Sequence, residues 1–281
     1  MPTKQSTLPK LAAWMQRAFV YVESVLLSEI AARSDRFIKE EHIRTALAKG
    51  LVLSDPVHGS WVQTEQKATW TDNGCRWCSK VPGSGRRLSH DVAVVEPKAA
   101  PGTRPRAVCE VMWLERESGV GVLEEIARLV LTRGTADHRD SVRTFLLLAG
   151  TDPGWSKTLR KVQGTLIPIK WSPAGRPSEG GSKDEFDLQK VLEVRPSMDE
   201  ALHRVLRWGK PRHLRGPESA FRSHLLTLRQ EWHRTFEGRK WRAALWELHR
   251  WGLAKDKRQV DWDAVLGTCK SCKAAGQQGK G

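Results

Sequence analysis

The run TFLLLAGT, residues 144–151, constrains the fold more than any other segment of the chain. It is apolar almost throughout and has the length of a strand, which is typical of a β-strand covered on both faces. The segment before it, GVGVLEEIARLVLTRG at residues 119–134, repeats its apolar residues at a helical period. We therefore expect an α/β protein with a mixed central sheet flanked by helices.

Four further short runs also have the character of strands. They are rich in Val, Ile and Trp, and turn clusters such as PGSG and PKAAPG separate the earlier ones. The runs are WVQTEQKATW at 61–70, DVAVVEP at 91–97, AVCEVMWLE at 107–115 and LIPIKW at 166–171. These runs place an α/β core at residues 61–171.

The residues ahead of this core are predicted to be helical. Residues 8–33 and 38–49 both carry apolar side chains at a helical period, and Gly50 is expected to end the second helix. We interpret residues 1–60 as an N-terminal helical extension of the core.

A change of composition follows the core. Residues 172–185, SPAGRPSEGGSKDE, are rich in Gly, Ser and Pro, and we interpret them as a linker. Beyond it, residues 186–281 are predicted to form a basic, Trp-rich helical part, in which Ser197 starts a capping box. Residues 218–252 are expected to form two helices broken near Gly238.

The charge of the chain is concentrated in this C-terminal part. The formal net charge is +15, and residues 201–281 hold 18 Lys and Arg against 7 Asp and Glu. Excess cations favour a polyanionic partner, because their contacts with phosphates release counterions; a merely soluble basic surface is the alternative. We expect a nucleic acid to be bound, and the candidate residues are Arg229, Arg234, Arg239, Lys240 and Arg242.

Tryptophans lie among these basic residues, and two interpretations of them stay open. Trp232, Trp241, Trp246 and Trp251 could stack on bases. Because the apolar residues around them recur at helical spacing, a buried core stripe is the favoured interpretation.

One charge interrupts the apolar strand AVCEVMWLE. Side chains alternate along a strand, so Glu110 and Met112 are expected to face one way while Cys109 faces the other. Asp91 opens the preceding strand, and the short connection between the strands suits an antiparallel hairpin. Two carboxylates that converge in this way can hold Mg²⁺ together with water and a substrate phosphate.

This order of elements resembles the PD-(D/E)XK nuclease superfamily, which has the restriction endonuclease-like fold. The family pattern is an Asp near the start of the second strand and Glu-x-Lys in the third, followed by a helix and an apolar strand. Asp91 and Glu110 match the acidic residues, and the resemblance covers roughly residues 10–155. It departs at Met112, which stands at the position of the motif lysine.

The resemblance implies a Mg²⁺- or Mn²⁺-dependent endonuclease that hydrolyses phosphodiester bonds, with double-stranded DNA as its partner. Asp91 and Glu110 would be the metal ligands, and Glu65 would be the additional acidic residue. Glu23, Glu29 and Glu41 on the N-terminal helices compete for that role, although a solvated helix face is the favoured interpretation of each. The resemblance also implies an effector of bacterial restriction or antiviral defence against phage, acting as a homodimer or in a larger defence complex.

Three interpretations of Met112 follow, because methionine has neither a proton to transfer nor a charge. The chain can be an inactive form that keeps the fold as a nucleic-acid-binding or scaffold subunit. The lysine can have moved, to Lys67 on the strand face of Glu65 or, as a cation, to Arg128 on the helix that follows. Alternatively the match is accidental, and a backbone or Arg partner satisfies Glu110.

The cysteines predict a separate site. Cys75 and Cys78 form one C-x-x-C pair, and Cys269 and Cys272 form a second. Two such pairs supply the four thiolates of a structural zinc site, which would here clamp the C-terminal tail onto the loop before Asp91. Cys109 is expected to be a small buried hydrophobe.

Several classes are excluded or disfavoured. No P-loop, Rossmann glycine pattern or Gly-x-Ser-x-Gly elbow occurs, which argues against a nucleotide hydrolase or a serine hydrolase. No apolar run reaches the length of a membrane span, and no secretory segment opens the sequence. We expect a soluble, cytoplasmic protein. The histidines, including His90 beside Asp91, are interpreted as surface or capping residues.

Overall fold

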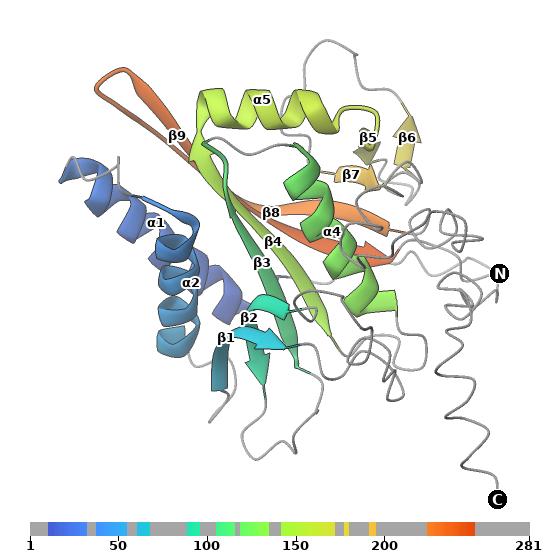
Figure 1. The fold of residues 1–281 in the computed structure, drawn as a ribbon, viewed down its shortest axis with the longest axis horizontal. Coiled ribbons are helices and arrows are strands. Elements are labelled where there is room, and N and C mark those ends of the chain that lie inside the picture. The colour runs from blue at the N-terminus through green and yellow to red at the C-terminus, as the bar shows by residue number, and fades with distance from the viewer. Residues whose placement is uncertain are drawn as a thin grey trace, which may run out of the picture.

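The computed structural model describes the chain in ten segments. These are residues 11–32, 38–54, 61–67, 89–95, 105–115, 119–134, 142–171, 177–179, 191–194 and 224–250. They form a mixed α/β structure built on one twisted sheet (Figure 1).

The sheet has nine strands in the order β1-β2-β3-β4-β9-β8-β7-β5-β6. β3 and β4 pair in parallel, and every other pair of neighbours is antiparallel. The strands are β1 (Trp61–Lys67), β2 (Ser89–Val95), β3 (Ala107–Trp113), β4 (Arg143–Thr151), β5 (Leu166–Trp171), β6 (Pro177–Glu179), β7 (Val191–Val194), β8 (His224–Phe236) and β9 (Arg239–Arg250).

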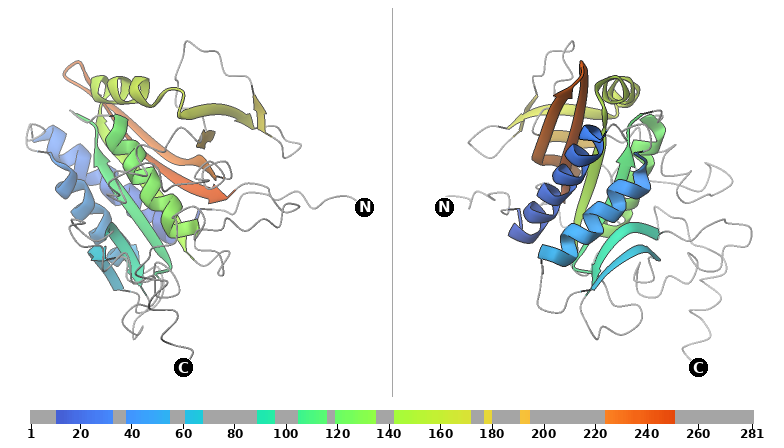
Figure 2. Two further views of the ribbon diagram at one scale, coloured as in Figure 1. Left: turned by 45° about the vertical axis from the view of Figure 1, so that its right-hand side comes forward. Right: turned by 90° about the vertical axis from the view of Figure 1, so that its left-hand side faces the viewer.

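Helices cover both faces of the sheet. α1 (Ala13–Ala31) and α2 (Glu40–Ser54) lie on one face, and α4 (Gly119–Gly134) and α5 (Asp152–Val162) lie on the other (Figure 2). α4 is the crossover between the parallel strands β3 and β4, as a parallel pair requires. The helices predicted ahead of the core are therefore part of its packing, and do not form an extension apart from it.

β4 is the central strand that the run TFLLLAGT predicted. Its side chains alternate between the two cores: Phe145 and Leu147 pack with α1 and α2, whereas Leu146 and Leu148 pack with α4 and α5. All four are buried. A strand with both faces covered gains from an apolar residue at every position, which explains the unbroken run.

The prediction that Gly50 ends the second helix is wrong. α2 continues to Ser54, and Gly50 is buried where the helix meets α1. A Cβ atom at Gly50 would lie 2.8 Å from the carbonyl oxygen of Ala18, so the glycine allows a close approach of the two helices. Packing against α1 offsets the low helix propensity of glycine.

The helices predicted at residues 218–252 are also wrong, because β8 and β9 form a β-hairpin. Leu245 packs toward α1 and α2, whereas Leu248, three residues on, packs toward α4 and α5. A strand buried on both faces can therefore mimic helical spacing. Trp241 and Trp246 are buried, which confirms the core interpretation for these two; Trp251 and the helix expected after Ser197 lie outside the described residues.

The hairpin also bears on the predicted division of the chain. β9 pairs with β4, so the sheet of the α/β core continues through β9, β8 and β7 into the part assigned to residues 186–281. The expected linker at 172–185 contains β6, which pairs with β5. The described strands on both sides of the linker thus belong to one sheet. No helix within the described segments is long and apolar enough to cross a membrane.

Candidate functional site

Asp91 and Glu110 lie side by side where β2 and β3 meet. The backbone pairing of β2 with β3 ends at Val92 and Cys109. Beyond these residues, carboxylate side chains accept hydrogen bonds from backbone amides of the neighbouring strand. The Val111 amide donates to Asp91 Oδ2 at 2.8 Å, and the Asp91 amide donates to Glu110 Oε2 at 3.3 Å. Each carboxylate is thus fixed by the backbone of the neighbouring strand.

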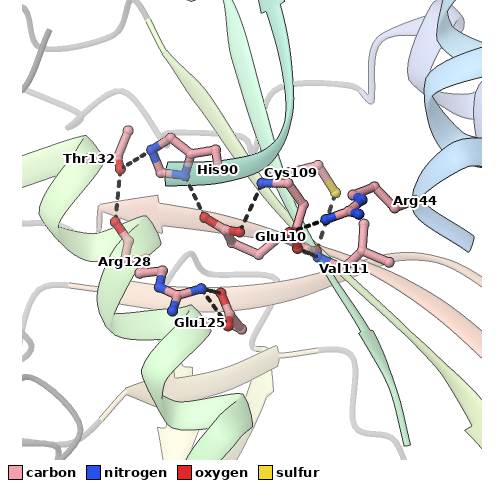
Figure 3. Close-up of polar contacts among 9 residues, drawn as sticks. Arg44, His90, Cys109, Glu110, Val111, Glu125, Arg128 and Thr132 are labelled. Atoms are coloured by element: carbon pink, nitrogen blue, oxygen red, sulfur yellow. Dashed lines mark hydrogen bonds and ion pairs between the residues drawn. The ribbon is translucent and has the colours of Figure 1, made fainter. Parts of the chain in front are cut away.

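The interpretation of His90 as a surface or capping residue is wrong, because its side chain is buried at the site. Neither its side chain nor that of Glu110 has any solvent exposure, at 0% each, and His90 Nδ1 is hydrogen-bonded to Glu110 Oε1. His90 Nε2 lies 2.9 Å from Thr132 Oγ1 on α4. Figure 3 shows this chain of contacts running from β3 through His90 to the helix.

The hydrogen bonds limit where the protons of His90 and Glu110 can lie. The Thr132 hydroxyl donates its one proton to the Arg128 carbonyl at 2.8 Å, so His90 Nε2 must donate to Thr132. A neutral imidazole then has no proton on Nδ1, and Glu110 supplies the proton of the bond between them. A neutral pair, with the proton on Glu110, is the state that burial of both side chains favours.

Burial is the main cause of this protonation state. It lowers the pKa of His90 to about 3, and the charge of Arg128 acts in the same direction. Burial also raises the pKa of Glu110 well above its usual value, and the negative charge of Asp91 adds to the rise. A neutral pair avoids most of the desolvation penalty of two buried charges.

α4 adds one more carboxyl group and one cation. Glu125 and Arg128 lie one turn apart, and Arg128 Nη1 donates to both Glu125 oxygens at 2.7 and 2.8 Å. Burial and the neighbouring Glu110 raise the pKa of Glu125 to about 9, although Arg128 opposes the rise. We call Asp91, Glu110, Glu125, His90, Arg128 and Thr132 the carboxylate network.

Glu65 approaches this network only through Arg44 of α2. Arg44 Nη1 lies 3.2 Å from Glu65 Oε1 and 3.6 Å from Asp91 Oδ1. The Glu65 side chain is 70% exposed, and its backbone has φ 52°, a left-handed conformation that is uncommon for a residue with a side chain. The backbone of Lys67 pairs with Ser89. Arg44 was not among the residues predicted for the site.

Met112 belongs to the apolar core. It is 5% exposed and lies in the same cluster as Val122, Ile126 and Leu129 of α4. Its thioether thus packs under the helix that carries Glu125 and Arg128, and a core residue of this kind contributes packing and no charge.

The oxygens that would bind Mg²⁺ already have partners in this arrangement. Glu110 contacts His90 and the Asp91 amide through its two oxygens. Asp91 contacts the Val111 amide and Arg44 through its own. A divalent cation prefers ionised, accessible carboxylates, so the pair fits Mg²⁺ only after these contacts break and Glu110 loses its proton. Within the described segments, no group of three His, Cys, Asp or Glu side chains is placed to hold a metal ion.

The candidate nucleic-acid residues divide into two sets. Arg229 Nε lies 2.9 Å from the buried Glu247, and Arg242 forms an ion pair with Asp152. These two cations support the sheet and the start of α5. Arg234, Arg239 and Lys240 are exposed near the turn of the β8–β9 hairpin.

The four cysteines predicted to bind zinc, Cys75, Cys78, Cys269 and Cys272, lie outside the described residues. Cys109 is buried among the residues that face α1 and α2, as expected for a small hydrophobe.

A sequence signal for the missed residues exists on α4. Glu125, Arg128 and Thr132 recur at spacings of three and four, which places them on one face of a helix. The neighbouring apolar positions of α4 are in the core, so polar side chains beside them face the sheet and need partners there. His90, next to Asp91, is one such partner.

Neither a family model nor a curated protein nor a solved structure matches this chain in comparisons with known proteins. Its fold and site define it as a layered α/β protein with a buried carboxylate network between sheet and helix.

Proposed function

We propose that the chain is a DNA-binding protein that retains a restriction endonuclease-like core and uses its carboxylate network to hold the fold. The element order supports this reading, because a helical pair precedes β2 with Asp91, β3 with Glu110, the crossover α4 and the apolar β4. The net charge of +15 supports a polyanionic partner.

The state of Glu110 carries the non-catalytic part of the proposal. A metal ligand in phosphodiester hydrolysis needs an ionised carboxylate open to the ion and its water. Glu110 is completely buried and hydrogen-bonded to His90, and burial favours its protonated form. Hydrolysis also requires a cation beside the attacking water, and Met112 cannot supply one because methionine is uncharged.

A second candidate is the Mg²⁺-dependent DNA endonuclease itself, as an effector of bacterial restriction or phage defence. One observation favours it: although burial opposes them, the charges of Glu125, Glu110 and Asp91 all raise the pKa of Arg128, so its cation acts on all three carboxyl groups. Arg128 could then replace the motif lysine from α4, provided that Asp91 and Glu110 are released from their present partners. Hydrolysis through Lys67 is the other form of this candidate.

Cleavage and binding assays on one set of variants separate the candidates. Plasmid DNA is incubated with Mg²⁺ or Mn²⁺ and with the parent chain, Asp91→Ala, Arg128→Gln, Met112→Lys, or the control Glu29→Ala on α1. We expect DNA binding by all five proteins and no cutting by the parent. Cutting by Met112→Lys alone would identify a nuclease that lost its lysine.

Two outcomes would contradict the proposal, one its non-catalytic part and the other its DNA-binding part. Cutting by the parent and by Glu29→Ala that is lost in Asp91→Ala establishes an endonuclease, and its loss in Arg128→Gln would place the cation on α4. Equal cutting by all variants, Asp91→Ala included, identifies a contaminating nuclease. The assay is then repeated on protein purified until the Asp91→Ala sample no longer cuts DNA. A parent that binds no DNA overturns the DNA-binding part.

A further inference from the structure

The β8–β9 hairpin reaches beyond the rest of the sheet. Pairing of β9 with β4 ends at Trp241, opposite Thr151, and pairing of β8 with β7 ends at Thr227. From Thr235 to Lys240 the two strands pair only with each other. Figures 1 and 2 show this part projecting past α5 as a two-stranded ribbon. We call residues 233–240 the hairpin arm.

The turn at the end of the arm is narrow. Phe236 pairs with Arg239, which leaves Glu237 and Gly238 as the loop, and their φ values are 47° and 75°. Positive φ at both central residues is the mark of a type I′ turn, whose twist matches that of the strands it joins. The arm therefore ends in a compact tip, with no side chain at Gly238.

Aromatic side chains anchor the arm along one face, from its base to the residue before its turn. Trp241 is buried and stacks on Trp113 with ring centroids 5.9 Å apart. Trp232 and Phe236 pack partly buried against the core formed with α1 and α2. The arm thus leaves the sheet in a defined direction, which lowers the entropy cost of using it as a binding element.

Cations lie on both faces of the arm. Strand alternation places Arg234 on the face of Trp232 and Phe236, and the pairing Phe236↔Arg239 places Arg239 there too. Lys240, which pairs with Thr235, lies on the opposite face. All three cations are exposed, and Glu237 is the one carboxylate in residues 233–240.

We propose that the hairpin arm enters the major groove of duplex DNA, where its three cations contact the phosphates that flank the groove. The major groove of B-form DNA is about 12 Å wide and accepts a two-stranded ribbon. Cations on both faces of such a ribbon meet the two phosphate walls at once. The inference rests on the proposed function, since it specifies how a chain that binds DNA would do so.

Shape and charge favour this partner over other nucleic acids. The major groove of an RNA duplex is deep and narrow, and a ribbon with side chains on both faces does not fit it. A single strand has no groove, and is bound mainly by stacking on exposed aromatic rings. The aromatic residue Trp241 at the base of the arm is instead buried in the core.

Fluorescence anisotropy with a DNA duplex of about 25 base pairs, more than two helical turns, tests the inference. The triple variant Arg234→Ala, Arg239→Ala, Lys240→Ala is compared with the parent over a range of salt concentrations. We expect the triple variant to bind at least about tenfold more weakly, and the slope of log Kd against log salt to fall by about 2 to 3.

A matched control removes the same charge elsewhere. Lys157, Arg160 and Lys161 are exposed on α5, and their triple alanine variant loses three cations as well. This control is expected to keep most of the affinity. Equal weakening by both triple variants would reduce the effect to net charge and overturn the role of the arm. The substituted positions are exposed, so an unchanged thermal unfolding temperature verifies the fold of each variant.

The probes separate failure of the inference from failure of the proposed function. A parent that binds duplex DNA equally well with and without the arm cations refutes the inference alone. A parent that binds no nucleic acid refutes both. If the triple variant loses as much affinity for single-stranded DNA as for duplex DNA, the arm cations act without insertion into a DNA groove. A preference of the parent for duplex RNA would show the same.

Discussion

Glu110 of β3 and His90 of β2 are hydrogen-bonded to each other, and neither side chain is exposed to solvent. Their bond, together with the Asp91 amide on Glu110 and Thr132 on His90, satisfies polar groups that the interior would otherwise penalise. The carboxyl group in the strand AVCEVMWLE thus ties β2, β3 and α4 together.

Replacement of Glu110 tests its protonation. Gln is a neutral isostere of a protonated Glu, so Glu110→Gln is expected to lower the free energy of unfolding by less than about 1 kcal/mol. Glu110→Ala leaves His90 without its partner and opens a cavity, at a cost of about 2 to 4 kcal/mol. Urea unfolding measures both. An equal loss in the two variants would mean that Glu110 is ionised in the folded state.

The pH dependence of stability follows from three members of the network, His90, Glu125 and Glu110. His90 stays neutral down to a pKa of about 3, whereas an unfolded histidine takes up a proton below about pH 6.5. The unfolded state then binds more protons, so the free energy of unfolding falls as the pH drops through this window. Glu125 keeps its proton up to about pH 9, whereas an unfolded Glu loses it above about pH 4.3, so stability also falls as the pH rises.

Glu110, whose pKa burial also raises, acts in the same direction as Glu125. Above about pH 4.3 the loss from these two carboxyl groups outweighs the gain from His90. We therefore expect maximal stability near about pH 4.5, measured as the unfolding temperature across the pH range. Glu125→Gln is the diagnostic variant, because it keeps a neutral hydrogen-bonding group and removes the titration. Its stability should fall less steeply than that of the parent above pH 6.5. The same alkaline slope in both proteins would exclude Glu125 as the cause.

The sequence carries the central part of the fold in its pattern of side chains. The run TFLLLAGT identifies β4 because a strand covered on both faces must be apolar at successive positions. Asp91 and Glu110 could be paired in advance, because strand alternation and a short connection fix their relative positions.

The rest of the site depends on contacts that no local pattern encodes. Leu245 and Leu248 follow a helical spacing, and only the pairing of β9 with β4 shows that they serve opposite cores. His90 and Thr132 are 42 positions apart in sequence, so their bond is visible only once α4 lies across the sheet. Gly238 was recognised as a break, yet a break between helices and a type I′ turn look alike in sequence.

The two C-x-x-C pairs predict one structural zinc ion per chain. Elemental analysis of protein purified without added metal is expected to find zinc at about one equivalent. Cys75→Ser and Cys269→Ser should each lower this value, because each pair supplies two thiolates. Cys109→Ser, which changes the buried thiol of β3, is the control that should keep the metal. A fully folded parent without zinc would remove the predicted site.

The turn of the hairpin arm offers a change that stabilises the fold and strengthens DNA binding together. Glu237 has φ 47°, where Asn and Gly are tolerated better than Glu. Glu237→Asn is therefore expected to raise the free energy of unfolding by about 0.5 to 1 kcal/mol, and to tighten duplex DNA binding because it removes the carboxylate of the arm. Glu237→Gln separates the two effects, since it removes the charge without a turn preference. Tighter binding by Asn but not by Gln would contradict the electrostatic explanation.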